Sequence, residues 1–212
     1  MVYIFDPPLG NSPGLISPLW DGLDDLNAYY RANKPIPAAK FPQPLIVDGP
    51  VQDVPDIFRP SSRVIVFSES ARALMEKSAP GQVEFIPVGI QIDHDSALQS
   101  NLASAYYYVN VLGRAQRFQW LEMPTRPCQT SEDDIERFVM IDDYSQWKLR
   151  QRASGEPLIW RESWWRFNNK EYRGHFEILI EDVLWQQLDG EFPNELNAIR
   201  VGASICPPEP SV

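Results

Sequence analysis

Ser68 is the residue whose type and position first suggest chemistry. It stands where the apolar run "RVIVF" ends and the helical pattern "SESARALMEKS" begins. Hydrolases of the α/β type place a nucleophilic serine at such a strand-to-helix turn, because the turn exposes the hydroxyl above the sheet. Serine is also a preferred N-cap residue, since its oxygen accepts a hydrogen bond from a free N–H of the first helical turn. The position therefore allows two roles, nucleophile or helix cap.

The residues around Ser68 and the supply of a base favour the cap. The hydrolase turn has small residues, usually glycine, two positions before and after the serine, whereas this chain has Val66 and Ser70 there. A base would have to be His94 or His175. His94 lies in the polar stretch "QIDHDSAL", which resembles no established triad sequence.

A second copy of the pattern also favours the cap. The run "EILIEDVLWQQL" aligns with "VIVFSESARALM", strand with strand and helix with helix, and has Glu181 opposite Ser68. A helix start accepts either residue, because serine caps the first amides and glutamate suits the positive end of the helix dipole. We therefore expect Ser68 to cap a helix, and a serine-dependent hydrolase is the alternative function.

No other set of residues has the spacing of a metal, cofactor or phosphate site. Cys128 and Cys206 are far apart and fit no metal-ligand or redox motif. The triplet "DHD", Asp93–Asp95, has no second cluster that would complete a ligand set. The sequence contains neither a glycine-rich phosphate loop nor a dinucleotide-binding motif. We expect no catalytic, cofactor-binding or metal-binding residue, and a protein that is not an enzyme.

The net charge of the chain limits the kinds of partner that it can bind. The formal net charge is -10 and the isoelectric point is about 4.7, so nucleic acid and anionic membranes repel the chain. Residues 146–175 differ, because seven basic residues and three acidic ones alternate there with aromatic residues. This mixture can serve nucleic-acid stacking. The aromatic residues of "LIWRESWWRF" also favour a strand with a core face, which we consider the stronger reading.

Acidic side chains are concentrated in two short segments. These are "SEDDIERF", with Glu132, Asp133 and Asp134, and "IDDY", with Asp142 and Asp143. Ser131 and Asp134 have the spacing of a capping box, so we expect a helix to begin in the first segment. The carboxylates are either a solvated helix start and turn or a surface that binds a basic partner.

The hydrophobic pattern predicts the elements that position these residues. The segments "RVIVF", "SESARALMEKS" and "QVEFIPVGI" predict a strand, a helix and a strand, and "HFEILI", "EDVLWQQLDG" and "NELNAIRV" predict the same order again. We expect an α+β fold with two similar strand-helix-strand lobes and a mixed β-sheet. The lobes would span 61–125 and 126–212, either as separate units or within one compact domain.

The first 60 residues form a Pro-rich segment that we expect to pack across both lobes. Eleven of the 20 prolines lie there, and proline removes the amide donors that regular elements need. A short helix is expected over 17–33, where apolar residues recur at helical spacing. The chain shows no basic leader and no apolar run of about 20 residues. We therefore expect a cytoplasmic protein that does not enter a membrane.

The order of segments resembles a family of bacterial immunity proteins, formerly a domain of unknown function, found beside polymorphic toxins and related contact-dependent or secreted effectors. The resemblance is carried by "VPDIFRPSSRVIVFSESARALM", "VEFIPVGI", "YYYVNVL" and "WRFNNKEYRGHFEILIEDVLWQQL", and it covers roughly Val54 to Val201. The chain departs from the family at Gly113 and Arg114, where an acidic residue is expected, and at Glu181, where a serine is expected.

The resemblance implies an immunity protein that binds and neutralises a cognate toxin, by covering its active site or locking its conformation. Such a protein needs no catalytic residues and no cofactor. If the toxin is a nuclease with a basic cleft, the acidic residues would take the place of the phosphates there. The expected partner-binding residues are Glu132, Asp133, Asp134, Asp142 and Asp143. The expected partner is a protein toxin, with no membrane and no direct nucleic acid.

Overall fold

The computed structural model describes residues 1–8, 28–29, 34–41, 43–47, 54–61, 64–92, 105–119, 123, 125–129, 135–139, 143–167, 170–175 and 177–202. Within them the strands are β1 (Val2–Ile4), β2 (Leu45–Val47), β3 (Ile57–Ser61), β4 (Val64–Ser68), β5 (Val83–Val88), β6 (Ile90–Ile92), β7 (Tyr106–Val111), β8 (Arg114–Ala115), β9 (Thr125–Gln129), β10 (Ile135–Val139), β11 (Ile159–Glu162), β12 (Trp164–Phe167), β13 (Lys170–Arg173), β14 (Leu179–Glu181) and β15 (Arg200–Val201). The helices are α2 (Glu69–Ser78) and α3 (Asp182–Glu191), with 3-10 turns η1 (Ala38–Lys40) and η5 (Tyr144–Gln146).

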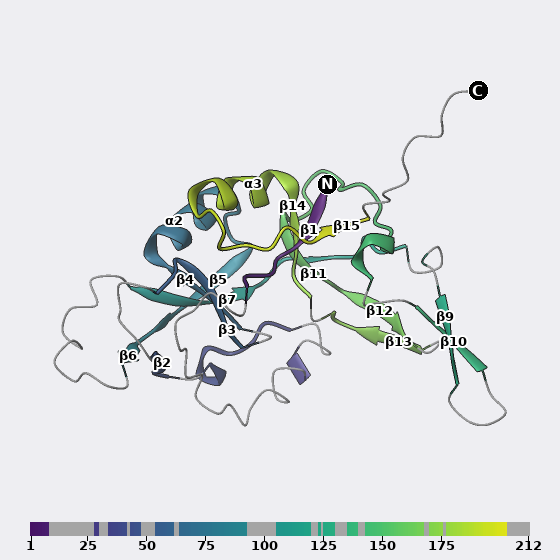
Figure 1. The fold of residues 1–212 in the computed structure, drawn as a ribbon, viewed down its shortest axis with the longest axis horizontal. Coiled ribbons are helices and arrows are strands. Elements are labelled where there is room, and N and C mark those ends of the chain that lie inside the picture. Colours follow the sequence, from purple (N-terminus) through teal and green to yellow (C-terminus); the bar gives the residue numbers. More distant parts are fainter. Residues whose placement is uncertain are drawn as a thin grey trace.

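Two sheets form the body of the described structure. The first has the strand order β3-β4-β7-β5 and is antiparallel throughout. The second has the order β15-β1-β14-β11-β8 and is mixed, because β8 runs parallel to β11. Helices α2 and α3 lie side by side on the same side of the two sheets (Figure 1). The expected α+β fold with a mixed sheet is confirmed.

The two sheets repeat one arrangement. Strands β4 and β5 are connected through α2 and run in the same direction, with β7 antiparallel between them. Strands β14 and β15 are connected through α3 in the same way, with β1 between them. Outside β4 lies β3, and outside β14 lies β11, each antiparallel to its neighbour. We call these the first unit (β3, β4, α2, β5, β7) and the second unit (β11, β14, α3, β15, β1).

The second unit takes its central strand from the N-terminal end of the sequence. Strand β1 precedes the whole first unit in sequence, yet it lies between β14 and β15 in the second sheet. In the first unit the equivalent strand, β7, follows β5 in the same part of the chain. The second unit therefore needs a strand that is separated from the rest of it by the whole first unit. The boundaries at 60 and 125 remain predictions.

The loops after the two helices are also equivalent. Gly81 and Asn194 stand at the same distance past their helices, and both have positive φ, 72° and 69°. The side chain of the next residue in each loop forms hydrogen bonds to the backbone of the other unit. Gln82 accepts N–H bonds from Leu158 at 2.7 Å and from Ile159 at 3.2 Å, where β11 begins.

Glu195 does the same in the opposite direction. Its carboxylate accepts N–H bonds from Asp56 at 3.1 Å and from Ile57 at 2.7 Å, where β3 begins. Each unit thus fixes the start of an outer strand in the other unit. These reciprocal contacts hold the two units in one orientation.

One hydrophobic core lies beneath both helices. It joins Ile65, Phe67, Ala71 and Met75 of the first unit to Ile178, Ile180, Leu184 and Leu188 of the second. The alternate residues of β4, Val64 and Val66, face another core that includes Phe41 and Tyr108. Because β4 is buried on both faces, its sequence is a continuous apolar run instead of an alternating one. Each fully buried aliphatic side chain contributes about 1.5–3 kcal/mol to folding.

A third core fills the other face of the second sheet. It includes Trp147, Trp160 and Phe118, of which the two tryptophans are almost completely buried. The prediction that the aromatic residues of "LIWRESWWRF" supply a core face is therefore confirmed for Trp160, and Trp147, which lies before that run, is buried in the same core. The side chains of Trp165, Phe167 and Tyr172 lie outside the described residues.

One predicted element is wrong. Residues of "SEDDIERF" were expected to start a helix, but Ile135–Val139 is strand β10 and pairs antiparallel with Thr125–Gln129 of β9. The reason is tertiary pairing, since every residue of β10 has a partner across the ladder. The helix expected over 17–33 lies outside the described residues, apart from helical positions 28 and 29. Within the described chain no helix has the length and apolar character needed to cross a membrane.

Candidate functional site

A basic pocket lies at one end of the second sheet. Its volume is about 560 Å³. Five basic side chains and one acidic one line it: Arg117, Lys148, Arg150, Arg152, Arg200 and Glu181. We call this cavity the basic pocket. In a chain of net charge -10, a cavity with this lining is an exception to the general field.

Three separate parts of the fold bring these side chains together. Glu181 is the last residue of β14, and Arg200 is the first residue of the edge strand β15. The other residues come from two segments that pair with each other. Arg150 donates its N–H to the carbonyl of Arg117 at 2.9 Å, and Phe118 bridges to Leu149. Both segments are thereby fixed to the body of the second unit.

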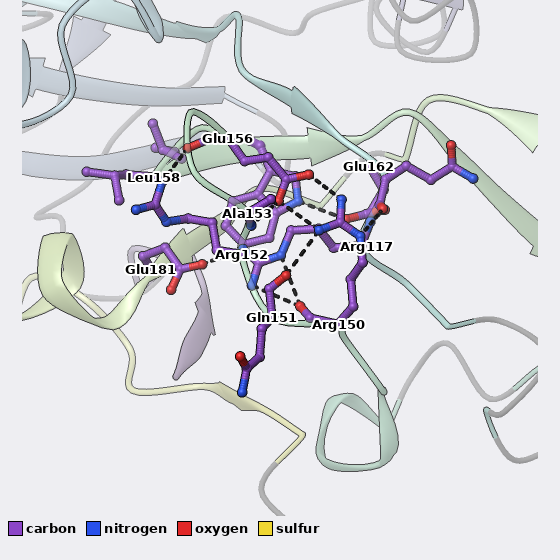
Figure 2. A network of polar contacts seen from close by, with 12 residues as sticks. Arg117, Arg150, Gln151, Arg152, Ala153, Glu156, Leu158, Glu162 and Glu181 are labelled. Carbon is purple, nitrogen blue, oxygen red and sulfur yellow. Dashed lines mark hydrogen bonds and ion pairs between the residues drawn. The ribbon is translucent and has the colours of Figure 1, made fainter.

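Arg117 is the buried floor of the pocket. Its side chain is 3% exposed and forms an ion pair with Glu181. Its other nitrogens donate to the carbonyl of Arg150 at 3.3 and 3.2 Å, and the guanidinium lies 4.4 Å from the ring centroid of Trp160. Figure 2 shows Arg117 between Glu181 and the carboxylate of Glu162. A buried arginine with this many partners is held in one conformation.

Glu162 is a buried carboxylate behind Arg117. Its oxygens accept N–H bonds from Trp160 Nε1 at 2.8 Å, from the backbone of Arg117 at 2.8 Å and from the backbone of Phe118 at 3.3 Å. Burial raises the pKa of this carboxyl to about 7, although these donors and the charge of Arg117 act in the opposite direction. Glu162 therefore orders the backbone that carries Arg117.

Arg150 lies on the pocket wall and is also paired. It forms an ion pair with Glu156 and donates to the carbonyls of Gln116 at 3.1 Å and Gln151 at 3.0 Å. The hydrogen bond from Arg150 is the main reason that the pKa of Glu156 falls to about 2. Arg152 and Arg200 are exposed at the pocket. Arg152 donates to the backbone carbonyl of Glu156 at 2.6 Å, and within the described part of the chain no carboxylate pairs with either arginine.

Glu181 and Glu156 pair with Arg117 and Arg150, and the two exposed arginines, Arg152 and Arg200, have no carboxylate partner among the described residues. Arginine guanidinium groups match the geometry of carboxylate and phosphate oxygens. The pocket is therefore suited to binding an anionic group. Nothing in its geometry places a nucleophile next to a base.

Ser68 is a helix cap, as predicted. It is the N-cap of α2, and its Oγ accepts the N–H of Ala71 at 3.3 Å while donating to a carboxylate oxygen of Asp56. The residue is only 3% exposed, so its hydroxyl lies beneath the surface. Glu181, opposite Ser68 in the repeat, is the N-cap residue of α3 but makes no side-chain cap.

No histidine in the described part of the chain is hydrogen-bonded to Ser68. His175 is completely buried against Phe118 and Trp147, and its Nδ1 accepts the N–H of Glu177 at 3.2 Å. Burial, with a smaller contribution from Arg161, lowers the pKa of His175 to about 3, so the ring stays neutral. His94 and the rest of Asp93–Asp95 lie outside the described residues.

Of the expected partner-binding residues, the structure describes only Asp143. Its carboxylate accepts the N–H of Ser145 at 3.2 Å and also binds Gln146, which makes it the cap of the 3-10 turn η5. The Ser145 hydroxyl also donates to this carboxylate. Together these hydrogen bonds lower the pKa of Asp143, and the bond from the Ser145 side chain makes the largest contribution. Glu132, Asp133, Asp134 and Asp142 lie outside the described residues.

The basic pocket was not predicted from the sequence. The alternation of Lys148, Arg150 and Arg152 was visible in "KLRQR", and an alternating basic run on extended backbone is a usable signal. Arg117 and Arg200 gave no comparable signal, because only the fold brings them to the same place. Among the residues that the structure describes, no three histidine, cysteine, aspartate or glutamate residues gather as a metal site.

Comparisons with known proteins found no matching family model and no significant match among curated proteins.

Proposed function

We propose that this chain is an immunity protein, which acts in the cytoplasm by binding and neutralising a cognate toxin. The observation that carries the proposal is the repeated unit. The segments on which the resemblance to immunity proteins rests correspond to β3, β4 and α2, then β5 and β7, and finally β12, β13, β14 and α3. Apart from β12 and β13, which form a separate two-stranded sheet, these elements belong to the two equivalent units of the fold in the same order.

The mechanism of neutralisation is steric. A protein that inhibits by covering an active site needs a surface whose shape is fixed before binding, because ordering on binding reduces affinity. The hydrophobic core that the two units share and the contacts of Gln82 and Glu195 fix the two units relative to each other. The inhibitor therefore binds as a rigid body, with little conformational cost.

The acidic residues remain part of this proposal. The net charge of -10 accelerates association with a basic partner, and the effect falls as salt screens it. Asp143, as the cap of η5, has a structural role that is compatible with contact to a partner. Reversal of Glu132, Asp133 and Asp134 to lysine tests the acidic surface, since an unchanged dissociation constant and salt dependence would exclude these three from the interface.

The test of the function is coexpression with the reading frame adjacent to this one in its genome. If the chain is an immunity protein, the neighbouring product inhibits growth, coexpression of this chain restores growth, and the two proteins copurify. Failure to restore growth and to copurify would contradict the proposal.

The variant Ser68→Ala separates binding from the alternative, a serine-dependent hydrolase. A binding protein retains its protective effect after this change, provided that it stays folded. A hydrolase that uses Ser68 loses protection while keeping its fold, as circular dichroism would show. Ser70→Ala is the matched control, because Ser70 is exposed in the first turn of the same helix.

A further inference from the structure

The described lining of the basic pocket contains none of the acidic residues to which the proposed function assigns partner binding. The pocket is rich in arginine and lysine. Its floor, Arg117, is fixed by Glu181, the backbone of Arg150 and the ring of Trp160 (Figure 2). Two further arginines, Arg152 and Arg200, are exposed at its lining. The pocket thus combines a fixed cation below with exposed cations above.

The charges determine which ligand fits. Two exposed arginines above a buried one can bind a group with about two negative charges, and a volume of about 560 Å³ accommodates a few side chains or a small molecule. Guanidinium groups bind carboxylate and phosphate oxygens in the same two-bond geometry. The chemistry of the site is therefore oxyanion binding, from carboxylates or from phosphates.

The surroundings favour carboxylates brought by a protein. The molecule as a whole is strongly acidic, so its long-range field repels a freely diffusing polyanion. Charges beyond about 8–10 Å are screened at physiological salt, so the pocket cations act only at short range. A partner protein whose basic surface is attracted to the acidic chain can carry an acidic segment into that range.

We propose that the basic pocket binds the carboxylates of an acidic segment of the partner protein, with Arg117 as the fixed floor and Arg152 and Arg200 as the contacting cations. This inference rests on the proposed function, because the segment belongs to the toxin. The complex then has contacts of both signs, which specify one partner and one orientation better than contacts of a single sign.

The test compares two double charge reversals that change the net charge equally. Arg152→Glu with Arg200→Glu alters two exposed cations of the pocket, and Arg117 stays intact so that the fold is preserved. Lys34→Glu with Lys77→Glu is the control, since both lysines are exposed and neither lines the pocket. Circular dichroism confirms that both variants are folded.

The first measurement is the affinity of the full chain for the product of the neighbouring reading frame. We expect the pocket reversal to weaken binding on the order of tenfold or more and to make it less dependent on salt, and the control to have a smaller effect. Equal effects of the two double variants would overturn the pocket proposal while leaving the proposed function intact.

The second measurement needs no toxin, and so separates the two proposals. Hexaglutamate and pyrophosphate are titrated separately into the full chain, starting near physiological salt, where the long-range repulsion of the acidic chain is screened and the pocket cations still act at short range. Binding of hexaglutamate that weakens with salt and disappears in the pocket reversal supports the pocket, even if the neighbouring product does not bind. Absence of hexaglutamate binding, or binding of pyrophosphate alone, contradicts the assignment to carboxylates.

Discussion

At the first strand–helix junction, Ser68 accepts the N–H of Ala71 and donates to Asp56, and its side chain is buried. At the second junction, Glu181 occupies the same position but leaves the helix uncapped and pairs with Arg117. The backbone is equivalent at the two places, and the side chains have different tasks. The polar groups of the first junction bind one another and nearby backbone, whereas Glu181 of the second junction pairs with an arginine of the basic pocket.

The difference shows how a repeated unit can acquire a binding site. A side-chain cap contributes only about 1 kcal/mol, so the second helix can form without one. Its core residues Leu184 and Leu188 hold it to the same hydrophobic core that holds the first helix. The cap position is then available to an acidic side chain, which positions a buried arginine at the floor of a pocket.

Arg117→Leu has the largest expected effect on the second junction. Removal of one partner from a buried ion pair costs about 3–5 kcal/mol, because the other charge is left without compensation. We expect a loss of this size in the free energy of unfolding, measured with urea. Combining it with Glu181→Leu should recover part of the loss, and a loss below about 1 kcal/mol for Arg117→Leu would contradict the assigned role.

Glu162→Gln tests the buried carboxylate behind that pair. Burial raises the pKa of Glu162 from 4.5 to about 7 in the folded chain, so the folded state holds the proton more tightly than the unfolded state. Protonated Glu162 makes its full contribution to the free energy of unfolding below about pH 4.5. As pH rises to about 7 this contribution is lost, and the free energy of unfolding falls by about 3 kcal/mol.

In Glu162→Gln, this fall of stability between pH 4.5 and 7 should be absent, as urea unfolding at several pH values would show. His175 is present in both proteins and acts in the opposite direction, since its pKa is lowered to about 3. The difference between the two curves therefore isolates Glu162. Parallel curves for the two proteins would show that the carboxyl does not titrate in this range.

Ser68→Ala tests the first junction and has a smaller expected effect. The helix loses its cap and Asp56 loses a donor, so we expect a loss of about 1–2 kcal/mol. Ser70→Ala, on the exposed side of the same turn, should change the free energy of unfolding by much less. If both variants lose the same amount, the cap is not the cause.

The loops after the helices give the smallest effect and the most direct comparison. Asn194 has φ 69° where the first unit has Gly81 at 72°. Because glycine adopts positive φ without strain, Asn194→Gly should stabilise the chain slightly or leave it unchanged, and Gly81→Asn should destabilise it by about 0.5–1 kcal/mol. Changes of opposite sign to these, measured by thermal unfolding, would show that the loops are not equivalent.

The repeat could be predicted because its pattern is local. The runs at β4 with α2 and at β14 with α3 each contain a strand, a cap position and a helix within a short stretch, and Ser68 and Glu181 both proved to be N-cap residues. The place of β1 in the second sheet could not be predicted, because it depends on pairing with β14 and β15 near the other end of the sequence. Ile135–Val139 forms a strand where a helix start was expected, because every residue of it pairs with the nearby strand β9.

The site was harder to predict than the fold. Arg117, Glu181 and Arg200 come from three distant places, and a lone arginine in the sequence does not reveal that it will be buried beside a carboxylate. Gly113 is another residue whose role depends on a distant part of the chain. A side chain there would meet the carbonyl of Ile159 at 2.0 Å, so the close approach of β11 requires glycine at this position.

The dissociation constant of the purified chain and the product of the neighbouring reading frame is the most direct test of the central claim, that this chain neutralises a toxin by binding it. Isothermal titration calorimetry with wild-type chain should give a defined stoichiometry and a constant in the nanomolar range, as is usual for rigid interfaces of standard size. No binding at concentrations of about 10 μM would contradict the claim, since a constant weaker than that cannot provide protection at ordinary cellular concentrations.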